Sequence, residues 1–181
     1  MAYWLFKSEP EVWSWTQQKA KGAAGEEWTG VRNYQARNNM RAMKLGDRGF
    51  FYHSNDGKAV VGIVEVCRLA HRDSTSDVDT WDCVDIRAVA DVPKPVTLDA
   101  IKLDPKLKDM VLVKNSRLSV QPVTAEEFTD LSAFGGGSFF LTSDIDAGDT
   151  TAWAAKSGNP GFEPIGTLSQ PFTGTLDGGG H

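Results

Sequence analysis

The sequence has few of the residues that disulfide frameworks and metal sites need. Its 181 residues include two cysteines, Cys67 and Cys83, and three histidines. The cysteines lie in apolar stretches, so we interpret them as buried free thiols of a reducing compartment, not as a disulfide. The histidines show none of the short spacings typical of zinc ligands. We therefore expect no metal ion and no cofactor.

Long apolar runs are also missing. No stretch approaches the roughly twenty apolar residues that a membrane-spanning helix requires. The first residues, "MAYWLFKSEP", lack the charged start and long apolar core of a secretory signal. We expect a cytoplasmic protein that does not bind membranes.

The chain has no overall surplus of positive charge. Its net charge of −5 at pH 7 argues against broad, sequence-independent binding to a phosphate backbone. The average hides a gradient, because residues 1–58 hold nine lysines or arginines and six acids, whereas residues 136–181 hold one lysine and five acids. The positive end of the chain also carries the aromatic and amide side chains.

Short strands and short helices alternate irregularly over the first 135 residues. Apolar and β-branched patterns predict strands at 2–7, 47–54, 59–70 and 80–92, and an extended segment at 115–123. The turn "NDGK" joins the second and third strands, and Pro93 and Pro95 are expected to end the fourth. Cap and breaker residues predict helices at 8–22, capped by Ser8, and at 32–47, capped by Asn33. Further helices are expected at 97–110, broken at Pro105, and at 124–131, capped by Thr124.

This order of elements predicts an α+β fold with a small, curved, largely antiparallel sheet or barrel and helices inserted between the strands. Regular βαβ alternation and the glycine-rich phosphate-binding fingerprints are absent, which argues against a nucleotide-binding parallel sheet. The composition changes near Gly135, since ten of the eighteen glycines lie in the last 46 residues. We expect one domain at 1–135 and a loosely structured, glycine-rich acidic tail at 136–181, with short strands near 138–141 or 166–172.

The segment "WTGVRNYQARNN", residues 28–39, combines two arginines, two large aromatic residues and four amides with no acid. Planar ligands such as nucleobases are stacked on aromatic rings and read by amides and arginines. Trp28 lies in a glycine-bounded loop, so we expect it outside the central core. For Trp4, Trp13 and Trp15 the core is the favoured position. A purely solvated helix face remains the alternative for the polar residues of this segment.

No set of nucleophile, base and orienting residue is evident. His53 is a lone histidine at a strand end, where a structural role is commoner than a catalytic one. Lys7 and Glu9 flank Ser8 and form the one candidate acid–base group, although these residue types are also usual where a strand meets a helix. We predict no catalytic residues.

Five blocks of the sequence together resemble the EVE domain family, which has a PUA-like fold and includes many small bacterial proteins. These blocks are "YWLFKSEP", "WTGVRNYQARNNMRAMKLGD", "FFYHSND", "VGIVEV" and "SRLSVQPVTAEEF". They occur in the family's order and run from Ala2 to Leu131. The segment between Leu69 and Trp81 is shorter here than in longer members.

The resemblance implies a PUA-like pseudo-barrel of about five to seven mostly antiparallel strands, related to the YTH domain that reads methylated adenine in RNA. It implies a non-enzymatic, monomeric reader whose partner is a modified nucleobase in DNA or RNA. The residues it places around the pocket are Lys7, Ser8, Trp28, Val31, Arg32, Asn33, Tyr34, His53, Ser54 and Arg117.

Two alternatives stay open. The ASCH domain, also PUA-like, includes a small amidohydrolase acting on acylated cytidine, and Lys7 and Glu9 would be the acid–base pair of such an enzyme. The other alternative is a partner-binding domain without a role in nucleic-acid recognition.

Overall fold

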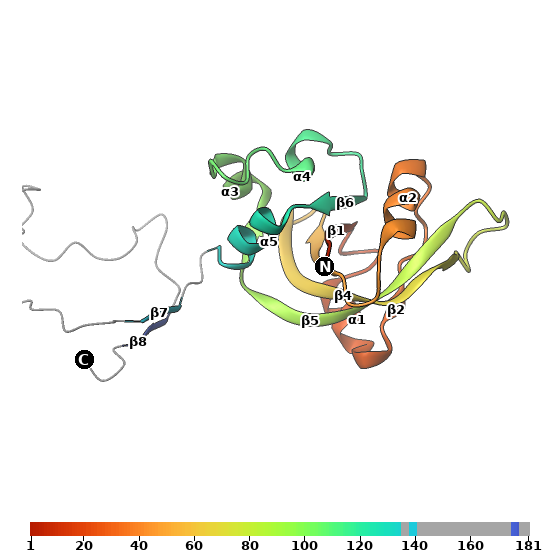
Figure 1. The fold of residues 1–181 in the computed structure, drawn as a ribbon, viewed down its shortest axis with the longest axis horizontal. Coiled ribbons are helices and arrows are strands. Elements are labelled where there is room, and N and C mark those ends of the chain that lie inside the picture. Colours follow the sequence, from red (N-terminus) through yellow and green to blue (C-terminus); the bar gives the residue numbers. More distant parts are fainter. Residues whose placement is uncertain (135–137, 141–174, 178–181) are drawn as a thin grey trace, which may run out of the picture. The chain divides into compact units, whose positions relative to one another are not determined.

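The computed structural model describes residues 1–134, 138–140 and 175–177 (Figure 1). The chain divides into two units, Met1–Phe134 and Gly135–His181. In the second unit, strand β7 (Ser138–Phe140) pairs in parallel with β8 (Thr175–Asp177). The strand predicted near Ser138 is therefore confirmed, while the strand predicted at 166–172 and most of the predicted tail fall outside the described residues.

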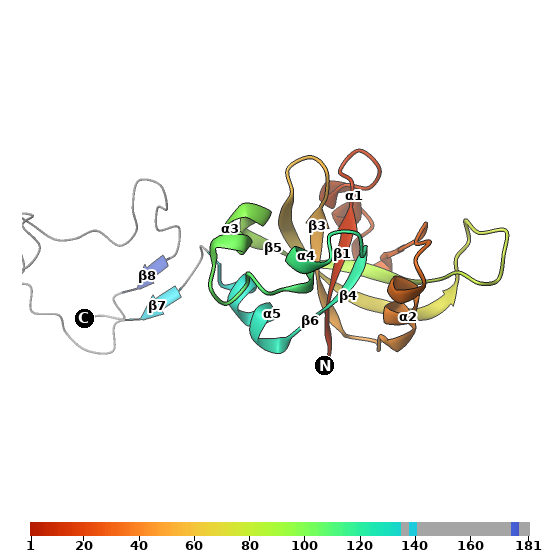
Figure 2. The same ribbon diagram turned by 90° about the horizontal axis from the view of Figure 1, so that it is seen from above.

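The first unit is built on one six-stranded sheet with the strand order β2-β5-β4-β3-β1-β6 (Figures 1 and 2). Its strands are β1 (Tyr3–Ser8), β2 (Glu26–Glu27), β3 (Arg48–His53), β4 (Ala59–Arg72), β5 (Asp82–Thr97) and β6 (Val120–Val123). The β1–β3 pair is parallel and the other four pairs are antiparallel. The sheet is open in the described part of the chain, since β2 and β6 form its two edges. The predicted α+β class, the PUA-like fold and the largely antiparallel sheet are confirmed.

Five short α-helices connect the strands: α1 (Trp15–Ala20), α2 (Tyr34–Ala42), α3 (Leu98–Leu103), α4 (Val111–Lys114) and α5 (Ala125–Ser132), with a 3₁₀ turn at Gly22–Ala24. Helices α3, α4 and α5 gather at one end of the sheet and α2 lies at the other (Figures 1 and 2). No helix among the described residues combines the length and the apolar composition needed to cross a membrane.

The first predicted helix begins later than expected. Ser8 belongs to β1, where it pairs with His53 of β3, and the helix starts at Trp15. Ser14 is the cap, because its hydroxyl accepts from the Gln17 N–H while the Gln17 side chain accepts from the Ser14 N–H. The prediction that Ser8 caps this helix is therefore wrong, because the sheet takes up this residue.

Strand β5 runs through both prolines to Thr97, so the prediction that they end it is wrong. Proline lacks the N–H that a strand between two neighbours must donate. Strand β2 pairs only with Asp85 and Ile86, so the far half of β5 has a partner on one side alone. This free edge tolerates Pro93 and Pro95.

Two buried apolar clusters lie on opposite faces of the sheet. Successive residues of a strand point to opposite faces, so Leu5 joins one cluster and Phe6 the other. Phe50 and Phe51 of β3 divide in the same way. The cluster around Phe6 also includes Ala36 and Met40 of α2 and Met43, which caps the end of this helix.

Candidate functional site

A cavity of about 470 Å³ opens beside the carboxyl ends of the parallel strands β1 and β3. The chain stays paired just past these ends, where the Ser54 N–H donates to the Ser8 carbonyl at 2.8 Å. The cavity is lined by Lys7, Ser8, Glu9, Val12, Trp13, Glu26, Glu27, Trp28, Thr29, Gly30, Val31, Arg32 and Ser119. Half of the ten predicted pocket residues are among them: Lys7, Ser8, Trp28, Val31 and Arg32.

Lys7 supplies a cation to the wall formed by β1. Its ammonium group donates to the Ser116 carbonyl at 2.5 Å and lies 5.8 Å from the centre of the Tyr52 ring. Partial burial lowers the pKa of Lys7 from its ordinary value, because leaving water disfavours the charged form. The group has further donor positions for a ligand, since an ammonium carries three N–H bonds.

Trp28 is both a cavity wall and part of the core. It is 7% exposed, and its ring meets Phe6 and Phe51 edge to face, with centroids 5.4 and 5.5 Å apart. Its backbone N–H donates to the Val84 carbonyl at 2.8 Å, which anchors the loop on β5. The prediction that Trp28 lies outside the central core is therefore wrong, because a glycine-bounded loop here passes directly over the apolar face of the sheet.

The indole N–H of Trp28 differs from those of three other tryptophans. These donate to a side chain: Trp4 to Asp47 at 3.3 Å, Trp13 to Gln18 at 2.9 Å and Trp15 to Asp91 at 2.5 Å. Trp28 has no such acceptor within the described residues. The one fully buried side-chain N or O atom without a partner there is Ser132 Oγ, so the Trp28 N–H keeps some access to solvent. Trp28 is one of the residues that line the cavity.

Trp13 forms part of the opposite wall, although the sequence favoured the core for it. It is half-buried, and its orientation is set by Gln18, whose own amide donates to the Ile86 carbonyl at 2.8 Å. Gln18 is fully buried, so this chain of hydrogen bonds fixes the Trp13 ring from inside the domain. The Lys21 ammonium lies 5.5 Å from the ring centre on its outer side.

Three acids also line the cavity: Glu9, which the hydrolase alternative names, and Glu26 and Glu27, which sequence reasoning missed. Glu26 pairs with Lys21 at 2.6 Å, and Glu27 accepts a hydrogen bond from the Ser74 hydroxyl. Glu9 is exposed, and its carboxylate has no ion pair within the described residues. The signal was present in "GEEW", where two acids immediately precede Trp28.

The main partner of Arg32 is Asp73, in the β4–β5 hairpin. Its guanidinium donates to the fully buried Asp73 carboxylate at 2.7 Å, and the Gly30 N–H donates to the same oxygen at 2.9 Å. Burial alone would raise the pKa of Asp73, but hydrogen bonds from Thr75, Arg32 and Gly30 outweigh it and lower the pKa to about 2. The loop before α2 is thereby tied to the hairpin.

Tyr34 and Arg37 lie on the outer surface, next to the ion pair between Arg32 and Asp73. The exposed Tyr34 ring is 5.0 Å from the Trp81 ring, and Arg37 stacks on Tyr34 at 5.0 Å. Arg37 also donates to the Thr80 carbonyl at 3.0 Å. Much of the donor capacity of residues 28–39 therefore holds the hairpin in place.

The remaining predicted residues lie outside the cavity lining: Asn33, Tyr34, His53, Ser54 and Arg117. Asn33 caps α2, with its side-chain oxygen accepting from the Ala36 N–H at 3.0 Å. His53 Nε2 accepts from the Trp15 N–H at 3.1 Å, and burial lowers the pKa of this histidine, which favours the neutral ring. Arg117 is exposed. Their assignment to a ligand site stays a prediction.

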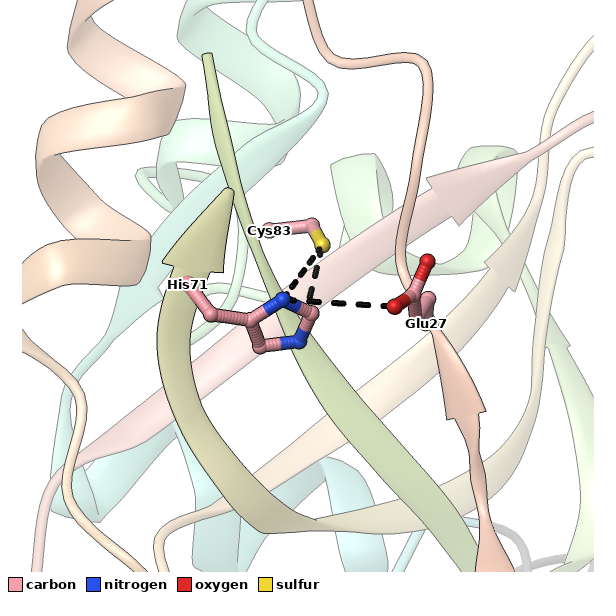
Figure 3. A group of neighbouring side chains, drawn as sticks. All are labelled: Glu27, His71 and Cys83. Atoms are coloured by element: carbon pink, nitrogen blue, oxygen red, sulfur yellow. Dashed lines mark hydrogen bonds and ion pairs between the residues drawn. The ribbon is translucent and has the colours of Figure 1, made fainter. Parts of the chain in front are cut away.

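Glu27 of β2 also belongs to a second polar group, together with His71 and Cys83 (Figure 3). Glu27, His71 and Cys83 place one carboxylate oxygen, one ring nitrogen and one sulfur within 4.8 Å of one another. His71 and Cys83 are neighbours because they pair across β4 and β5. Burial, followed by the nearby acids, raises the pKa of the Cys83 thiol to about 12. Both cysteines are free, as predicted.

Comparison with known proteins finds a match between residues 2–133 and the model of the EVE domain. The chain is 39% identical over 158 residues to thymocyte nuclear protein 1 of chicken (Gallus gallus), which covers 70% of this chain and 65% of that protein. The chain therefore spans slightly less than two thirds of this relative's length.

Two solved structures share the fold. A protein from Agrobacterium tumefaciens is 67% identical, with a TM-score of 0.71 over 73% of this chain and 91% of that one. The human THYN1 protein, solved in complex with DNA containing 5-methylcytosine, is 35% identical, with a TM-score of 0.67 over 74% of this chain and 96% of that one.

Proposed function

The chain belongs to the EVE domain family, and from this premise we propose that its first unit is a non-enzymatic reader of a modified nucleobase in DNA or RNA. The base would enter the cavity between Lys7 and Trp28. A volume of about 470 Å³ falls within the usual range for small-ligand sites. The human relative's complex makes 5-methylcytosine the first base to test on this chain.

The observation that carries the proposal is the Trp28 indole. Its ring is fixed by Phe6 and Phe51, yet its N–H has no acceptor within the described part of the chain. A buried polar group that lacks a partner costs free energy unless a ligand or water satisfies it. Water can satisfy the Trp28 N–H in the free protein, because this group keeps some access to solvent, and an acceptor atom on the edge of a base in the cavity would replace that water.

The other polar groups of the lining suit a cytosine-type edge. Cytosine carries an amino group, which donates a hydrogen bond to a carboxylate. Next to it lie the ring nitrogen and the carbonyl oxygen, which accept hydrogen bonds. Glu9 supplies a carboxylate without an ion pair among the described residues, and Lys7 supplies a cation with donor capacity to spare. The half-buried Trp13 ring adds an aromatic surface, and stacking on such a ring contributes about 1–3 kcal/mol per base.

The test compares Trp28→Phe with Trp4→Phe. Both tryptophans are 7% exposed and belong to the same apolar cluster, but Trp4 does not line the cavity. Each variant keeps an aromatic ring and loses its indole N–H. Affinity for a short oligonucleotide containing 5-methylcytosine should fall roughly two- to tenfold for Trp28→Phe, the value of one hydrogen bond, and stay unchanged for Trp4→Phe.

Equal affinities of the two variants would show that the Trp28 N–H does not contribute to binding of the base. Absence of binding to any modified DNA or RNA by the unaltered protein would instead favour the partner-binding alternative. Circular dichroism of both variants controls for the loss of core packing, and Trp4→Phe in addition loses the hydrogen bond to Asp47.

The hydrolase alternative rests on Lys7, whose pKa is lowered by burial, and on Glu9 in the same lining. A lysine of this kind is a candidate general base. Incubation with acylated and alkylated nucleosides distinguishes the two functions. A reader leaves them intact, whereas turnover that is lost in both Lys7→Met and Glu9→Gln would establish an enzyme.

A further inference from the structure

Glu27, His71 and Cys83 converge from three different strand segments on one point (Figure 3). The Cys83 sulfur lies 3.8 Å from His71 Nδ1 and 3.7 Å from Nε2, and Glu27 Oε1 lies 3.9 Å from Nδ1. The sulfur is buried, while the imidazole and the carboxylate are 18% and 28% exposed. One side of the group is therefore dry and the other is open to solvent.

These separations are close to those between the ligands of a tetrahedral zinc ion. Bond lengths of about 2.3 Å to sulfur, 2.0–2.1 Å to nitrogen and 2.0–2.2 Å to oxygen place tetrahedral ligands roughly 3.4–3.6 Å apart. The sulfur–Nδ1 and Oε1–Nδ1 distances exceed this by a few tenths of an ångström, and the third separation, between the sulfur and the carboxylate oxygen, is within 4.8 Å. Small side-chain rotations would close the difference without moving the strands.

The surroundings of His71 match those of a metal-bound histidine. Its other ring nitrogen, Nε2, lies 2.7 Å from the Asp85 carboxylate. A ligating histidine almost always donates its second N–H to a carboxylate or carbonyl, which fixes the ring and increases its basicity. Asp85 is itself only 15% exposed, so this contact is held in place by the sheet.

The two oxygens of the Glu27 carboxylate have different partners. One oxygen, Oε2, accepts from the Ser74 hydroxyl, which leaves Oε1 directed to His71. The Arg68 guanidinium lies 3.9 Å from Oε1 and 3.7 Å from the Asp85 carboxylate, and its side chain is 58% exposed. The Arg72 carbonyl, 3.0 Å from His71 Nδ1, is the contact that an incoming ion would replace.

We propose that Glu27 Oε1, His71 Nδ1 and Cys83 Sγ form a binding site for one Zn²⁺-like divalent ion, with solvent as the fourth ligand. A thiolate, an imidazole and a carboxylate are the three ligand types that zinc prefers. Binding releases the Cys83 thiol proton to solvent. The site is independent of the proposed reading of bases, although Glu27 belongs to both linings.

The experiment uses the full chain, stripped of metal by a chelator and titrated with Co²⁺ as a spectroscopic substitute for Zn²⁺. One equivalent should produce the visible bands of a tetrahedral cobalt ion and the near-ultraviolet thiolate charge-transfer band. Excess Zn²⁺ should abolish both. Cys83→Ser should lose the charge-transfer band, and Cys67→Ser, which alters the other free thiol, should keep it.

Two further variants guard against a folding defect in Cys83→Ser. His71→Ala removes a half-buried ligand, and Asp85→Asn leaves all three ligands in place while weakening binding by roughly ten- to hundredfold. Thermal midpoints without metal show that each variant is folded. A cobalt spectrum without a thiolate band in the unaltered protein, or a band lost in Cys67→Ser, would overturn the proposal and leave a hydrogen-bonded cluster only.

Discussion

The Arg32 guanidinium and the Asp73 carboxylate form a 2.7 Å ion pair that joins the loop before α2 to the β4–β5 hairpin. The carboxylate is fully buried, whereas the guanidinium remains 39% exposed. The Gly30 N–H shares the same carboxylate oxygen. Because Gly30 and Arg32 both line the cavity, the hairpin holds one wall of the candidate site in position.

Because of this ion pair, the free energy of unfolding depends on pH in the acidic range. The pKa of Asp73 is about 2 in the folded chain, compared with an ordinary value of 3.8. A lowered folded pKa stabilises the protein above the unfolded value, and the contribution is lost as the pH falls from about 4 to 2. Asp73→Asn should lower the free energy of unfolding by about 2 kcal/mol at pH 7. Denaturant titrations should show a smaller difference between variant and parent near pH 3.

Asp79→Asn is the matched control, because Asp79 lies in the same hairpin and pairs with Arg72, but is 86% exposed. An exposed ion pair contributes little, so this variant should stay within about 0.5 kcal/mol of the parent. Equal effects of the two substitutions would contradict the role given to the buried carboxylate.

Local signals account for the elements that the sequence predicted well. The cap of α2 at Asn33 and the capping box of α5 at Thr124 each depend on residues three or four positions apart. The turn after β3 uses left-handed backbone at Asn55 and Gly57, as the "NDGK" pattern predicts. Such signals are complete within a few residues of sequence.

The features that sequence reasoning missed depend on pairing between distant segments. The pairing of β2 with β5 brings Glu27 level with Asp85, and the β4–β5 pairing sets His71 opposite Cys83. The arginine of "VRNYQ" looked free for a ligand because its partner, Asp73, lies 41 residues away. Composition shows which groups exist, but only the fold shows which are already engaged.

Asn33→Ala should act on stability more than on recognition. The Asn33 side-chain oxygen is occupied by the Ala36 N–H at 3.0 Å. Loss of such a cap costs about 1 kcal/mol, and Asn33→Asp or Asn33→Ser should restore it. Chemical denaturation measures the loss, and ligand titration of the folded alanine variant measures recognition. A severe binding defect in a fully folded Asn33→Ala would assign Asn33 to the site after all.

Binding of long unmodified nucleic acid should be weak, with a shallow dependence on salt. Several cations near the cavity are already paired, including Arg32 with Asp73, Arg41 with Asp82 and Lys21 with Glu26. Two or three remaining phosphate contacts give a slope of about −2 to −3 in a plot of log affinity against log salt on duplex DNA. Fluorescence anisotropy over a salt series measures it. A slope near −6 would require a basic surface that the net charge of −5 does not suggest.

Gly62 on β4 should be intolerant of any side chain, because the Trp15 ring lies directly over it. A Cβ atom at Gly62 would be 2.1 Å from Trp15 Cζ2, far inside contact distance. Gly62→Ala should therefore cost about 1–3 kcal/mol through overpacking. The smaller ring of Trp15→Phe lacks the clashing atoms, so Gly62→Ala should cost less in that background.

A double-mutant cycle isolates this coupling, since the loss of the hydrogen bond from Trp15 to Asp91 is common to both phenylalanine variants and cancels. We expect a coupling of about 0.5–3 kcal/mol in the free energy of unfolding. A coupling energy of zero would mean that the Trp15 ring moves aside for the Gly62→Ala methyl group without a cost in free energy. The result also concerns the candidate site, because the backbone N–H of Trp15 donates to the His53 ring. His53 lies at the strand end beside which the cavity opens.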